Sequence, residues 1–453
     1  MEPTTYHPKN KNEDAILAPV RRTTFEEFWL WAVLLGLMGL GVYAYLTQWN
    51  TGLGITGLNR PVYWGIYITN FVFFIGLAHS GTFISAILRL AGAGWRKPLT
   101  RAAEAITLFS LPFGVGSILI DMGRPDRLLN IFFYGRFESP LLWDITAVSL
   151  YLFSSIVFFY LSLLPDIALC RDRLTEAPAW QQKMYQILAL GWSGRPEQFH
   201  RLERVLDGMA IFMTLLVVTV HTVVSWVFGM TVQPGWHTAL IGPFFLIGAI
   251  FSGTAAVVIV LAILRRVYHM EEVLPISLFN SLRKLLIVFT VAWLYMMITE
   301  FLTISYGGLA EEMPVVWQKF TGDFAVLFWT MALTVFVFPM IIFLFLGKNH
   351  IGWMVTASVL INIGMWIERF VVIVPTESRP RFVSTLMDGM GNYQPTWVEA
   401  AITVALFAGL TLLYVIFTRL FPIVPIWETA EETEAELPSA EPRRKIFGMQ
   451  RNS

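Results

Sequence analysis

The feature that most constrains this chain is a series of ten apolar runs, each close to the length that crosses a lipid bilayer. A helix of about 20 residues covers the roughly 30 Å hydrocarbon core. The runs are continuous, whereas an outer-membrane barrel would need alternating apolar and polar residues. The sequence therefore predicts an all-α polytopic membrane protein with about ten transmembrane helices. The predicted spans are 28–46, 63–88, 102–121, 141–164, 209–230, 243–264, 285–306, 324–346, 351–374 and 397–421.

Composition supports lipid as the main solvent of the chain. Of the 453 residues 56% are hydrophobic and 14% are charged, against about 25% charged residues in soluble domains. The 32 basic and 32 acidic side chains balance, so the basic excess typical of nucleic-acid binders is missing. Cys170 is the only cysteine, which excludes a disulfide or a cysteine-ligated iron–sulfur cluster within this chain.

Lysine and arginine predict the orientation of the spans, because cytoplasmic segments are enriched in them. The N-terminal segment, the loops after the even-numbered spans and the C-terminal segment, counted with Arg419 at the end of span 10, together hold 24 basic residues. The loops after the odd-numbered spans hold 7, and Arg369 inside span 9 completes the 32. We therefore expect both termini in the cytoplasm and the odd loops outside.

Two short segments repeat at an offset of 172 residues. Ile75–Thr82 and Ile247–Thr254 agree at five of eight positions, near the start of spans 2 and 6. An offset of four spans preserves the direction of the chain, so the repeat would be parallel. His79 of the first copy stands where the second copy has Phe251. The repeat predicts two four-helix bundles, spans 2–5 and spans 6–9, with spans 1 and 10 peripheral.

This organisation predicts six successive regions. Residues 1–27 form a cytoplasmic segment, 28–62 the first span with an external loop, 63–242 the first bundle and 243–396 the second bundle. Residues 397–427 form the last span and 428–453 a charged cytoplasmic tail.

Ionisable side chains inside the apolar runs are costly, and they usually face a bundle interior or a cavity. Tracing the chain places His79 and His221 near mid-membrane and most of the acids in the outer half. Each group also has a structural interpretation: an acid can lie among head groups, a histidine can bond a backbone carbonyl, and Glu368 can pair with Arg369. The eight residues are His79, Glu104, Asp121, Asp144, His221, Glu300, Glu368 and Arg369.

Histidine counting limits the redox groups that the chain could hold. A di-heme membrane site needs four histidines in facing helices, and only His79 and His221 lie deep in predicted spans. One heme between spans 2 and 5 is conceivable, and two are not. The sequence contains no clustered zinc ligands, no Walker A motif and no dinucleotide-binding fingerprint. We therefore expect no heme and no iron–sulfur cluster in this chain.

The most distinctive pattern lies between spans 3 and 4. Asp121-x-Gly-Arg-Pro-x-Arg127 is followed by Ser139-Pro-x-x-Trp143, and span 2 contains Gly76-x-x-His79-Ser-Gly-Thr. This pattern resembles the signature of the NrfD/polysulfide reductase family of membrane subunits, over spans 2–9. Within that family, the ten spans and the acid in Trp143-Asp144 are most similar to the ActC subunit of alternative complex III.

The resemblance implies a membrane subunit that binds menaquinone or ubiquinone and holds no redox cofactor of its own. It implies three kinds of partner in the bacterial inner membrane: a periplasmic iron–sulfur subunit, a second NrfD-like membrane subunit and cytochrome c subunits. The complex would be respiratory or photosynthetic, with proton translocation as an accompanying activity.

Quinol oxidation releases two electrons and two protons, and it therefore needs bases of tunable pKa near the ring oxygens. We expect His79 and Asp144 to accept the protons, with Asp121 and Arg124 as the outer wall or the proton exit. A proton path would use His221, Glu300, Glu368 and Arg369. Two other functions stay open: a secondary transporter, because parallel repeats with buried charges suit one, and a purely structural membrane anchor.

Overall fold

The computed structural model describes residues 12–21, 25–236, 238–379 and 391–430, and these residues are helical with connecting loops and no strand. Ten of the helices are long and apolar enough to cross a membrane. The predicted all-helical membrane fold is confirmed. The charged tail predicted at 428–453 lies outside the described residues from position 431 onward.

The long helices follow the predicted spans closely. They are α2 (Phe25–Thr51), α3 (Ile66–Leu90), α4 (Thr100–Asp121), α6 (Pro140–Arg173), α8 (Pro196–Gly229), α9 (Ile241–Val267), α10 (Ile276–Gly307), α14 (Ile351–Glu377) and α16 (Trp397–Leu420). The remaining span is built from α12 (Ala325–Ala332), η4 (Leu333–Val337), α13 (Phe338–Ile341) and η5 (Ile342–Leu346), in which η4 and η5 are π-helical. Short helices are α1 (Glu13–Arg21), η1 (Leu53–Ile55), η2 (Gly94–Arg96), η3 (Pro125–Arg127), α5 (Asn130–Tyr134), α7 (Ala179–Leu188), α11 (Met313–Phe320) and α17 (Ile426–Thr429).

The predicted loop 165–208 is much shorter in the structure. Helix α6 continues to Arg173 and α8 begins at Pro196, so only 174–195 connects them, and this connection contains the short helix α7. An apolar run marks only the part of a helix that lies in lipid. Polar turns that extend the helix into water carry no such mark.

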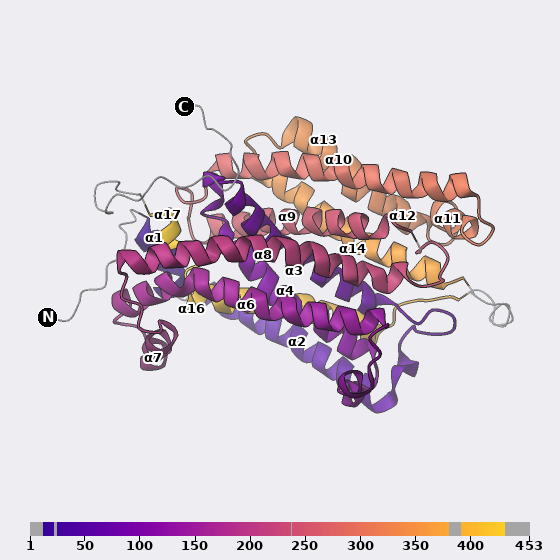
Figure 1. The fold of residues 1–453 in the computed structure, drawn as a ribbon, viewed down its shortest axis with the longest axis horizontal. Helices are drawn as coiled ribbons and strands as arrows, with labels where there is room; N and C mark the ends of the chain where they lie inside the picture. The colour runs from indigo at the N-terminus through magenta and orange to yellow at the C-terminus, as the bar shows by residue number, and fades with distance from the viewer. Residues whose placement is uncertain (1–11, 22–24, 237, 380–390, 431–453) are drawn as a thin grey trace.

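Helix packing fits the two predicted bundles. Helices α3, α4, α6 and α8 contact one another in a closed ring, and α9, α10, α14 and the broken span α12–η5 form a second group. Helices α2 and α16 pack together, and α16 also packs on α3 and α4. Figure 1 shows the long helices side by side, with α1, α7 and α17 at one end and α11 at the other. We call these the terminal end and the loop end.

The repeated segments meet at the contact between the bundles. A Cβ atom on Gly76 of α3 would lie 3.6 Å from Ala249 of α9, and one on Gly253 would collide with the Ser80 hydroxyl. Small residues let helices approach closely in lipid, where packing drives association. The repeat therefore marks the seam along which α3 and α9 hold the bundles together.

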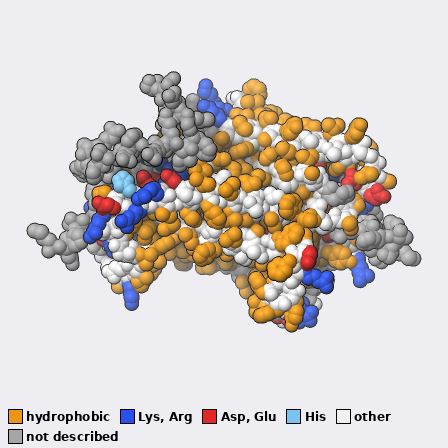
Figure 2. Space-filling model, viewed as in Figure 1, with side chains coloured by type: hydrophobic (Ala, Val, Ile, Leu, Met, Phe, Trp, Pro, Cys, Tyr) orange, Lys and Arg blue, Asp and Glu red, His pale blue; other side chains and the backbone are white. Residues whose placement is uncertain are grey.

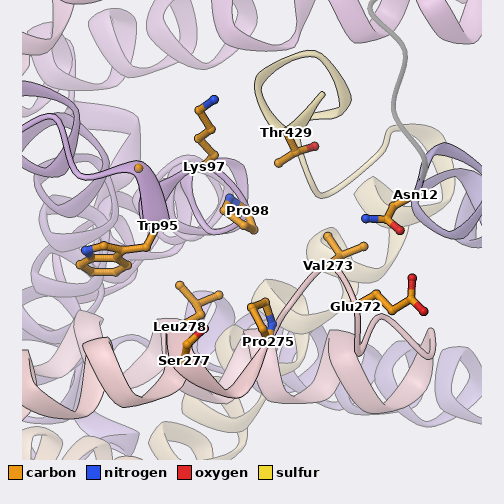
Figure 3. Close-up of a pocket in the computed structure, with 11 residues that line it drawn as sticks. Asn12, Trp95, Lys97, Pro98, Glu272, Val273, Pro275, Ser277, Leu278 and Thr429 are labelled. Atoms are coloured by element: carbon orange, nitrogen blue, oxygen red, sulfur yellow. The ribbon is translucent and has the colours of Figure 1, made fainter. Parts of the chain in front are cut away.

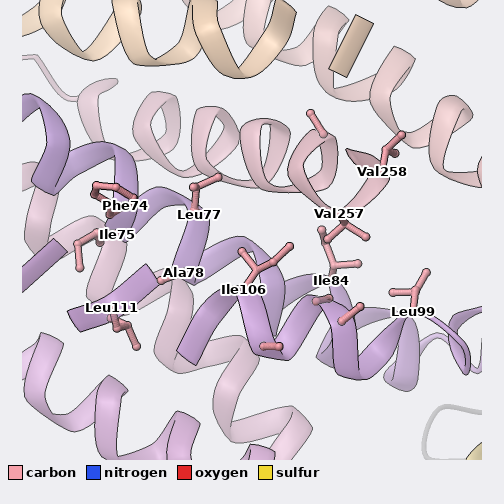
Figure 4. Close-up of a cluster of buried hydrophobic side chains, with 14 of the residues drawn as sticks. Phe74, Ile75, Leu77, Ala78, Ile84, Leu99, Ile106, Leu111, Val257 and Val258 are labelled. Carbon is pink, nitrogen blue, oxygen red and sulfur yellow. The ribbon is translucent and has the colours of Figure 1, made fainter. Parts of the chain in front are cut away.

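The core is continuous across this seam. Figure 4 shows Phe74, Leu77, Ile106 and Val257, which come from α3, α4 and α9, within one cluster of buried apolar side chains. The outer face is also largely apolar, with charged side chains gathered toward the two ends in the view of Figure 2. That distribution suits a multi-pass membrane protein.

Candidate functional site

The two deep histidines meet at the centre of the first bundle. His79 of α3 and His221 of α8 are fully buried, and their Nδ1 atoms lie 2.8 Å apart in a hydrogen bond. The rings are almost perpendicular, at 88°, with centroids 4.9 Å apart. Both Nε2 atoms are buried and make no hydrogen bond to the described residues. The sequence placed both histidines at mid-depth, but it gave no indication that they touch.

Hydroxyl groups surround this pair on the α4 and α6 side. The Tyr151 ring of α6 lies 4.5 Å from the His79 ring, centroid to centroid. Its hydroxyl donates to the Ala78 carbonyl at 2.9 Å, and the Thr107 hydroxyl donates to the same carbonyl at 2.6 Å. The Thr107 oxygen in turn accepts the backbone N–H of Thr82 at 2.8 Å. An α-helix ordinarily pairs these same two backbone groups, so the Thr107 hydroxyl bridges them and ties α4 to α3 beside His79.

Asp144 lies on the same face of α6 as Tyr151, because the two residues are seven positions, or two turns, apart. It is 4% exposed, and its Oδ1 atom makes no hydrogen bond to the described part of the chain. Two helical turns correspond to about 10 Å along the axis, so Asp144 lies nearer the loop end than His79. A ring with oxygens at opposite edges can reach an imidazole and a carboxylate at such a separation.

Asp121 lies in a different environment from Asp144. Its electrostatic neighbours are Glu377 and Glu399, at the loop ends of α14 and α16. Glu377 accepts backbone N–H groups of Tyr63 and Trp64 at 2.7 and 2.8 Å, and Glu399 accepts that of Gly57 at 2.8 Å. The Oδ1 atom of Asp121 is buried without a hydrogen bond to described residues. Asp121 therefore belongs to an acidic cluster that organises the loop end.

The arginine expected beside these acids faces outward. Arg124 makes two hydrogen bonds of 3.0 Å to Asp126, and the two side chains are 63% and 50% exposed. The guanidinium holds the pKa of Asp126 below its usual value through these bonds. In the structure Arg124 thus pairs with the exposed Asp126.

The second bundle holds a separate cluster of charged groups. Glu300 of α10 and Glu368 of α14 both interact with Lys319 of α11, and Arg369 lies 3.0 Å from a Glu368 carboxylate oxygen. Burial lowers the pKa of the Lys319 ammonium, against the attraction of Glu300 and Glu368. Arg369 also lies 4.7 Å from the centroid of the Phe245 ring. We call Glu300, Lys319, Glu368 and Arg369 the charge cluster.

Lys319 was not among the expected site residues. It lies in an external loop of the sequence, where a single lysine only adds to the basic count. In the structure α11 folds back against α10 and α14, and Lys319 is 7% exposed. Helix α11 (Met313–Phe320) has Pro314 in its first turn, and a proline at this position is a local sign in the sequence that a helix begins.

Glu104 of α4 is bonded within the protein interior. It is 2% exposed and accepts hydrogen bonds from Ser85 at 2.6 Å and Ser162 at 2.9 Å. One turn away, Arg101 and Asp166 form a fully buried ion pair of 2.6 Å. These contacts lie at the terminal end of the first bundle.

The segment after α16 closes that end. Arg101 donates to the carbonyls of Pro422 and Val424, and Asp166 accepts the backbone N–H of Ile426. Glu428, the first residue of the predicted charged tail, is buried against Arg89 and Arg96. We call residues 421–430 the strap.

Two cavities lie at the terminal end, far from His79. One of about 360 Å³ is lined by Trp95, Lys97 and Glu272 among others (Figure 3), and one of about 580 Å³ by Asn349 and Trp353 among others. Neither contains any of the expected quinol-site residues.

The geometry of the histidine pair also tests whether one heme could bind between α3 and α8. A heme with two axial imidazoles needs iron between them, with each metal–nitrogen bond about 2 Å long, and a porphyrin plane separating the helices. The direct Nδ1–Nδ1 contact of 2.8 Å leaves no such space between α3 and α8. These two residues, as arranged, do not fit a heme.

Comparison with known proteins identifies the family of the chain. The profile of the family described as polysulphide reductase, NrfD, matches residues 54–380. A subunit of selenate reductase from Mesobacillus selenatarsenatis is 23% identical over 401 residues, which cover 85% of this chain and 91% of that protein.

Two further relatives align over most of their length. The Hdr-like menaquinol oxidoreductase integral membrane subunit of Archaeoglobus fulgidus is 24% identical over 90% of this chain and 97% of its own. The probable Ni/Fe-hydrogenase 2 b-type cytochrome subunit of Escherichia coli is 25% identical over 83% of this chain and 87% of its own. Because the family profile matches well over half of the length of this chain, the chain belongs to the polysulphide reductase NrfD family of membrane proteins.

Proposed function

We propose that the chain is the quinol-oxidising membrane subunit of an electron-transfer complex. The observation that supports this most is the set of buried acid–base groups on facing helices of the first bundle, namely His79, Tyr151 and Asp144. The name of the Archaeoglobus relative, a menaquinol oxidoreductase subunit, supports menaquinol or ubiquinol as the substrate. Selenate reductase is likewise a redox enzyme of several subunits by its name.

The chemistry needs two bases and one electron acceptor. A quinol head between α3 and α6 would give one hydroxyl proton to His79 and the other to Asp144, as its two electrons leave. The electrons pass to an iron–sulfur subunit at the loop end, because this chain has one cysteine and cannot hold such a cluster itself. Asp121 would take up the proton from Asp144 on its way out.

The proposed complex resembles alternative complex III. It contains the periplasmic iron–sulfur subunit, a second NrfD-like membrane subunit and cytochrome c subunits, in the bacterial inner membrane. The terminal end faces the cytoplasm, in accord with the 24 to 7 distribution of basic residues. His221 and the charge cluster then serve as a proton path in the membrane.

The two alternatives have less support. Transporters of this kind bind substrate where paired helices are broken at mid-membrane, and α3 and α9 run unbroken. A purely structural anchor would have no use for a buried carboxylate oxygen without a hydrogen bond to the described residues, such as Oδ1 of Asp144, since such an oxygen costs stability.

The test is quinol turnover of the purified complex carrying Asp144→Asn. The substitution keeps the volume and removes a proton acceptor, so turnover should fall at least about tenfold, within the range of general-base contributions. Asp121→Asn should have a smaller effect. The matched control is Glu138→Gln, an exposed residue of the same external segment, which should leave turnover unchanged. Wild-type turnover in both Asp144→Asn and His79→Ala would reject the site.

Orientation has its own test, which uses the single native cysteine. In a Cys170→Ser background, Asp126→Cys should react with a membrane-impermeant reagent added from outside, and Trp180→Cys should not. Both side chains are exposed in the structure, so the difference reports the membrane side. The reverse pattern would invert the proposed topology.

The proposal also expects no b-type heme in the chain. A reduced-minus-oxidised spectrum of the isolated protein should lack a b-type band. A band that disappears in both His79→Ala and His221→Ala would contradict this expectation and would require α3 and α8 to separate.

A further inference from the structure

The strongest unexplained feature is the direct bond between two buried imidazoles, one on each side of a helix contact. His79 and His221 touch through Nδ1, and each has a buried Nε2 without a hydrogen bond to the described residues. A hydrogen bond that only tied α3 to α8 would not need a titratable group at both ends.

The bond dictates the tautomers of the pair. In two neutral rings, one Nδ1 carries the hydrogen and donates it, and the other Nδ1 accepts. The donor ring therefore has a bare Nε2, and the acceptor ring has its hydrogen on Nε2. The pair is thus a proton acceptor at one outer nitrogen and a proton donor at the other.

The two outer nitrogens belong to rings with different neighbours. The His79 ring contacts Tyr151 of α6, in the bundle that also holds Asp144. The His221 ring lies toward the second bundle: its centroid is 6.3 Å from that of Phe245 in α9, whose backbone also approaches it, and it interacts with Arg369 of α14. Arg369 and Phe245 are themselves in contact.

We propose that His79 and His221 form a proton relay that carries a proton from the quinol site in the first bundle to the charge cluster in the second. This inference rests on the proposed function, because the quinol supplies the proton. A proton adds to the bare Nε2 of His79, the hydrogen on its Nδ1 passes to Nδ1 of His221, and the hydrogen on Nε2 of His221 leaves. One proton enters and one leaves, and no other bond changes.

The receiving group is the buried carboxylate of Glu368. Neither of its oxygens accepts a hydrogen bond from the described residues, although the Arg369 guanidinium lies 3.0 Å away. Both rings are neutral before and after the proton passes. After each passage both rings hold the opposite tautomer, and the pair must be reset before the next proton.

The experiment separates a relay from a hydrogen bond that only holds helices together. In His221→Asn the amide N–H can still donate to Nδ1 of His79, but an amide does not pass on a proton. Turnover of the purified complex should fall at least about tenfold with assembly intact, and its pH profile should lose the limb contributed by the imidazole pair. His200→Asn, an exposed histidine near the start of α8, is the matched control and should behave as wild type.

A second readout does not depend on activity. In the complex labelled with ¹⁵N-histidine, nuclear magnetic resonance should show two bonded rings, one with a protonated and one with a bare Nδ1. These signals should disappear in both His79→Ala and His221→Asn. Rings that are not bonded to each other would overturn the relay even if His221→Asn failed to assemble.

The outcomes also distinguish the relay from the proposed function. Wild-type turnover and pH profile in His221→Asn, together with a loss in Asp144→Asn, would overturn the relay and leave quinol oxidation standing. Wild-type turnover in Asp144→Asn and His79→Ala would overturn the proposed function, and the relay from quinol with it.

Discussion

The two bundles bury polar groups of different kinds. At its centre the first bundle holds the mutually bonded imidazoles of His79 and His221, and the hydroxyls of Tyr151 and Thr107 donate to the backbone carbonyl beside them. Its buried ion pair lies apart from them, at the terminal end. The second bundle holds formal charges, such as Lys319 and Arg369 between acids. Neutral hydrogen-bonding groups of tunable protonation suit proton exchange with a substrate, whereas opposite charges stabilise one another and can hold or pass a proton.

The first helices of the two repeats, α3 and α9, differ in the same way as the two bundles, because the first carries the more polar interior. At the position of His79, the second copy has Phe251, which is also fully buried. Of the most apolar stretch of each helix, 83% is buried in α3 and 61% in α9. The copies share the small residues that pack α3 against α9 and differ in the residues that carry chemistry.

The largest stability effect should come from the terminal end of the first bundle. Arg101→Leu leaves Asp166 buried without its cation and frees the strap from its carbonyl bonds. Breaking a buried ion pair costs about 3–5 kcal/mol. Thermal unfolding of the purified complex would measure the loss. Arg124→Leu, which breaks an exposed pair with Asp126, should leave the unfolding temperature almost unchanged, because exposed ion pairs contribute little to stability; equal losses would contradict the role of burial.

The next largest loss of stability should come from adding a methyl group at two close helix contacts, one between α3 and α4 and one at the seam between α3 and α9. A Cβ on Gly81 would collide with the backbone oxygen of Ala103, so Gly81→Ala should cost about 1–3 kcal/mol as an overpacked contact. A Cβ on Gly253 would collide only with the Ser80 side chain, so Ser80→Gly should restore the stability lost in Gly253→Ala. Gly116→Ala, with open space around it, is the control. A Gly81→Ala variant as stable as this control would show that α3 and α4 are further apart.

A histidine placed at position 251 of α9, the counterpart of His79, tests whether that position alone is enough to create a quinol site or whether the surrounding residues are needed. Phe251→His places an imidazole in the apolar core of α9, where a buried group without a partner costs about 1–3 kcal/mol. We expect lower stability and no increase in quinol binding, since the described helices of the second bundle contain no histidine to pair with it. A second equivalent of bound quinone analogue would show that the second bundle retains the binding geometry.

The smallest effect should come from the charge cluster. Lys319→Met removes the cation between Glu300 and Glu368, and quinol turnover should fall less than the roughly tenfold loss expected for a direct base. Lys319→Arg keeps the charge and should preserve turnover. If Lys319→Met reduced turnover as much as Asp144→Asn, the second bundle would take part in the chemistry itself.

Much of this architecture follows from the sequence because lipid imposes simple rules on length and charge. The spans and the depth of His79 and His221 depend only on apolar runs and on the direction of the chain. Contacts between distant helices carry no such local mark. Three features depend on how helices rotate and fold back: the bond between the two histidines, the environment of Asp121 and the burial of Lys319. Hydropathy predicts neither rotation nor folding back.

The burial of the strap could not be predicted from the sequence either. Glu428 reads as the first acid of a charged tail, but it is buried because Arg89 and Arg96 lie beside it in space. Similarly, Glu104 reads as an acid at a membrane surface until Ser85 and Ser162 are seen to bond it.

The most direct test of a quinol site in the first bundle is to map where a quinone binds. A photoreactive quinone analogue, cross-linked in the purified complex and located by mass spectrometry, should label peptides of α3 and α6 around His79 and Asp144. Excess unlabelled quinone should abolish the labelling, and Asp144→Asn should reduce it. Competed labelling of α10 or α14 around Glu300 and Glu368, with α3 and α6 unlabelled, would contradict the account.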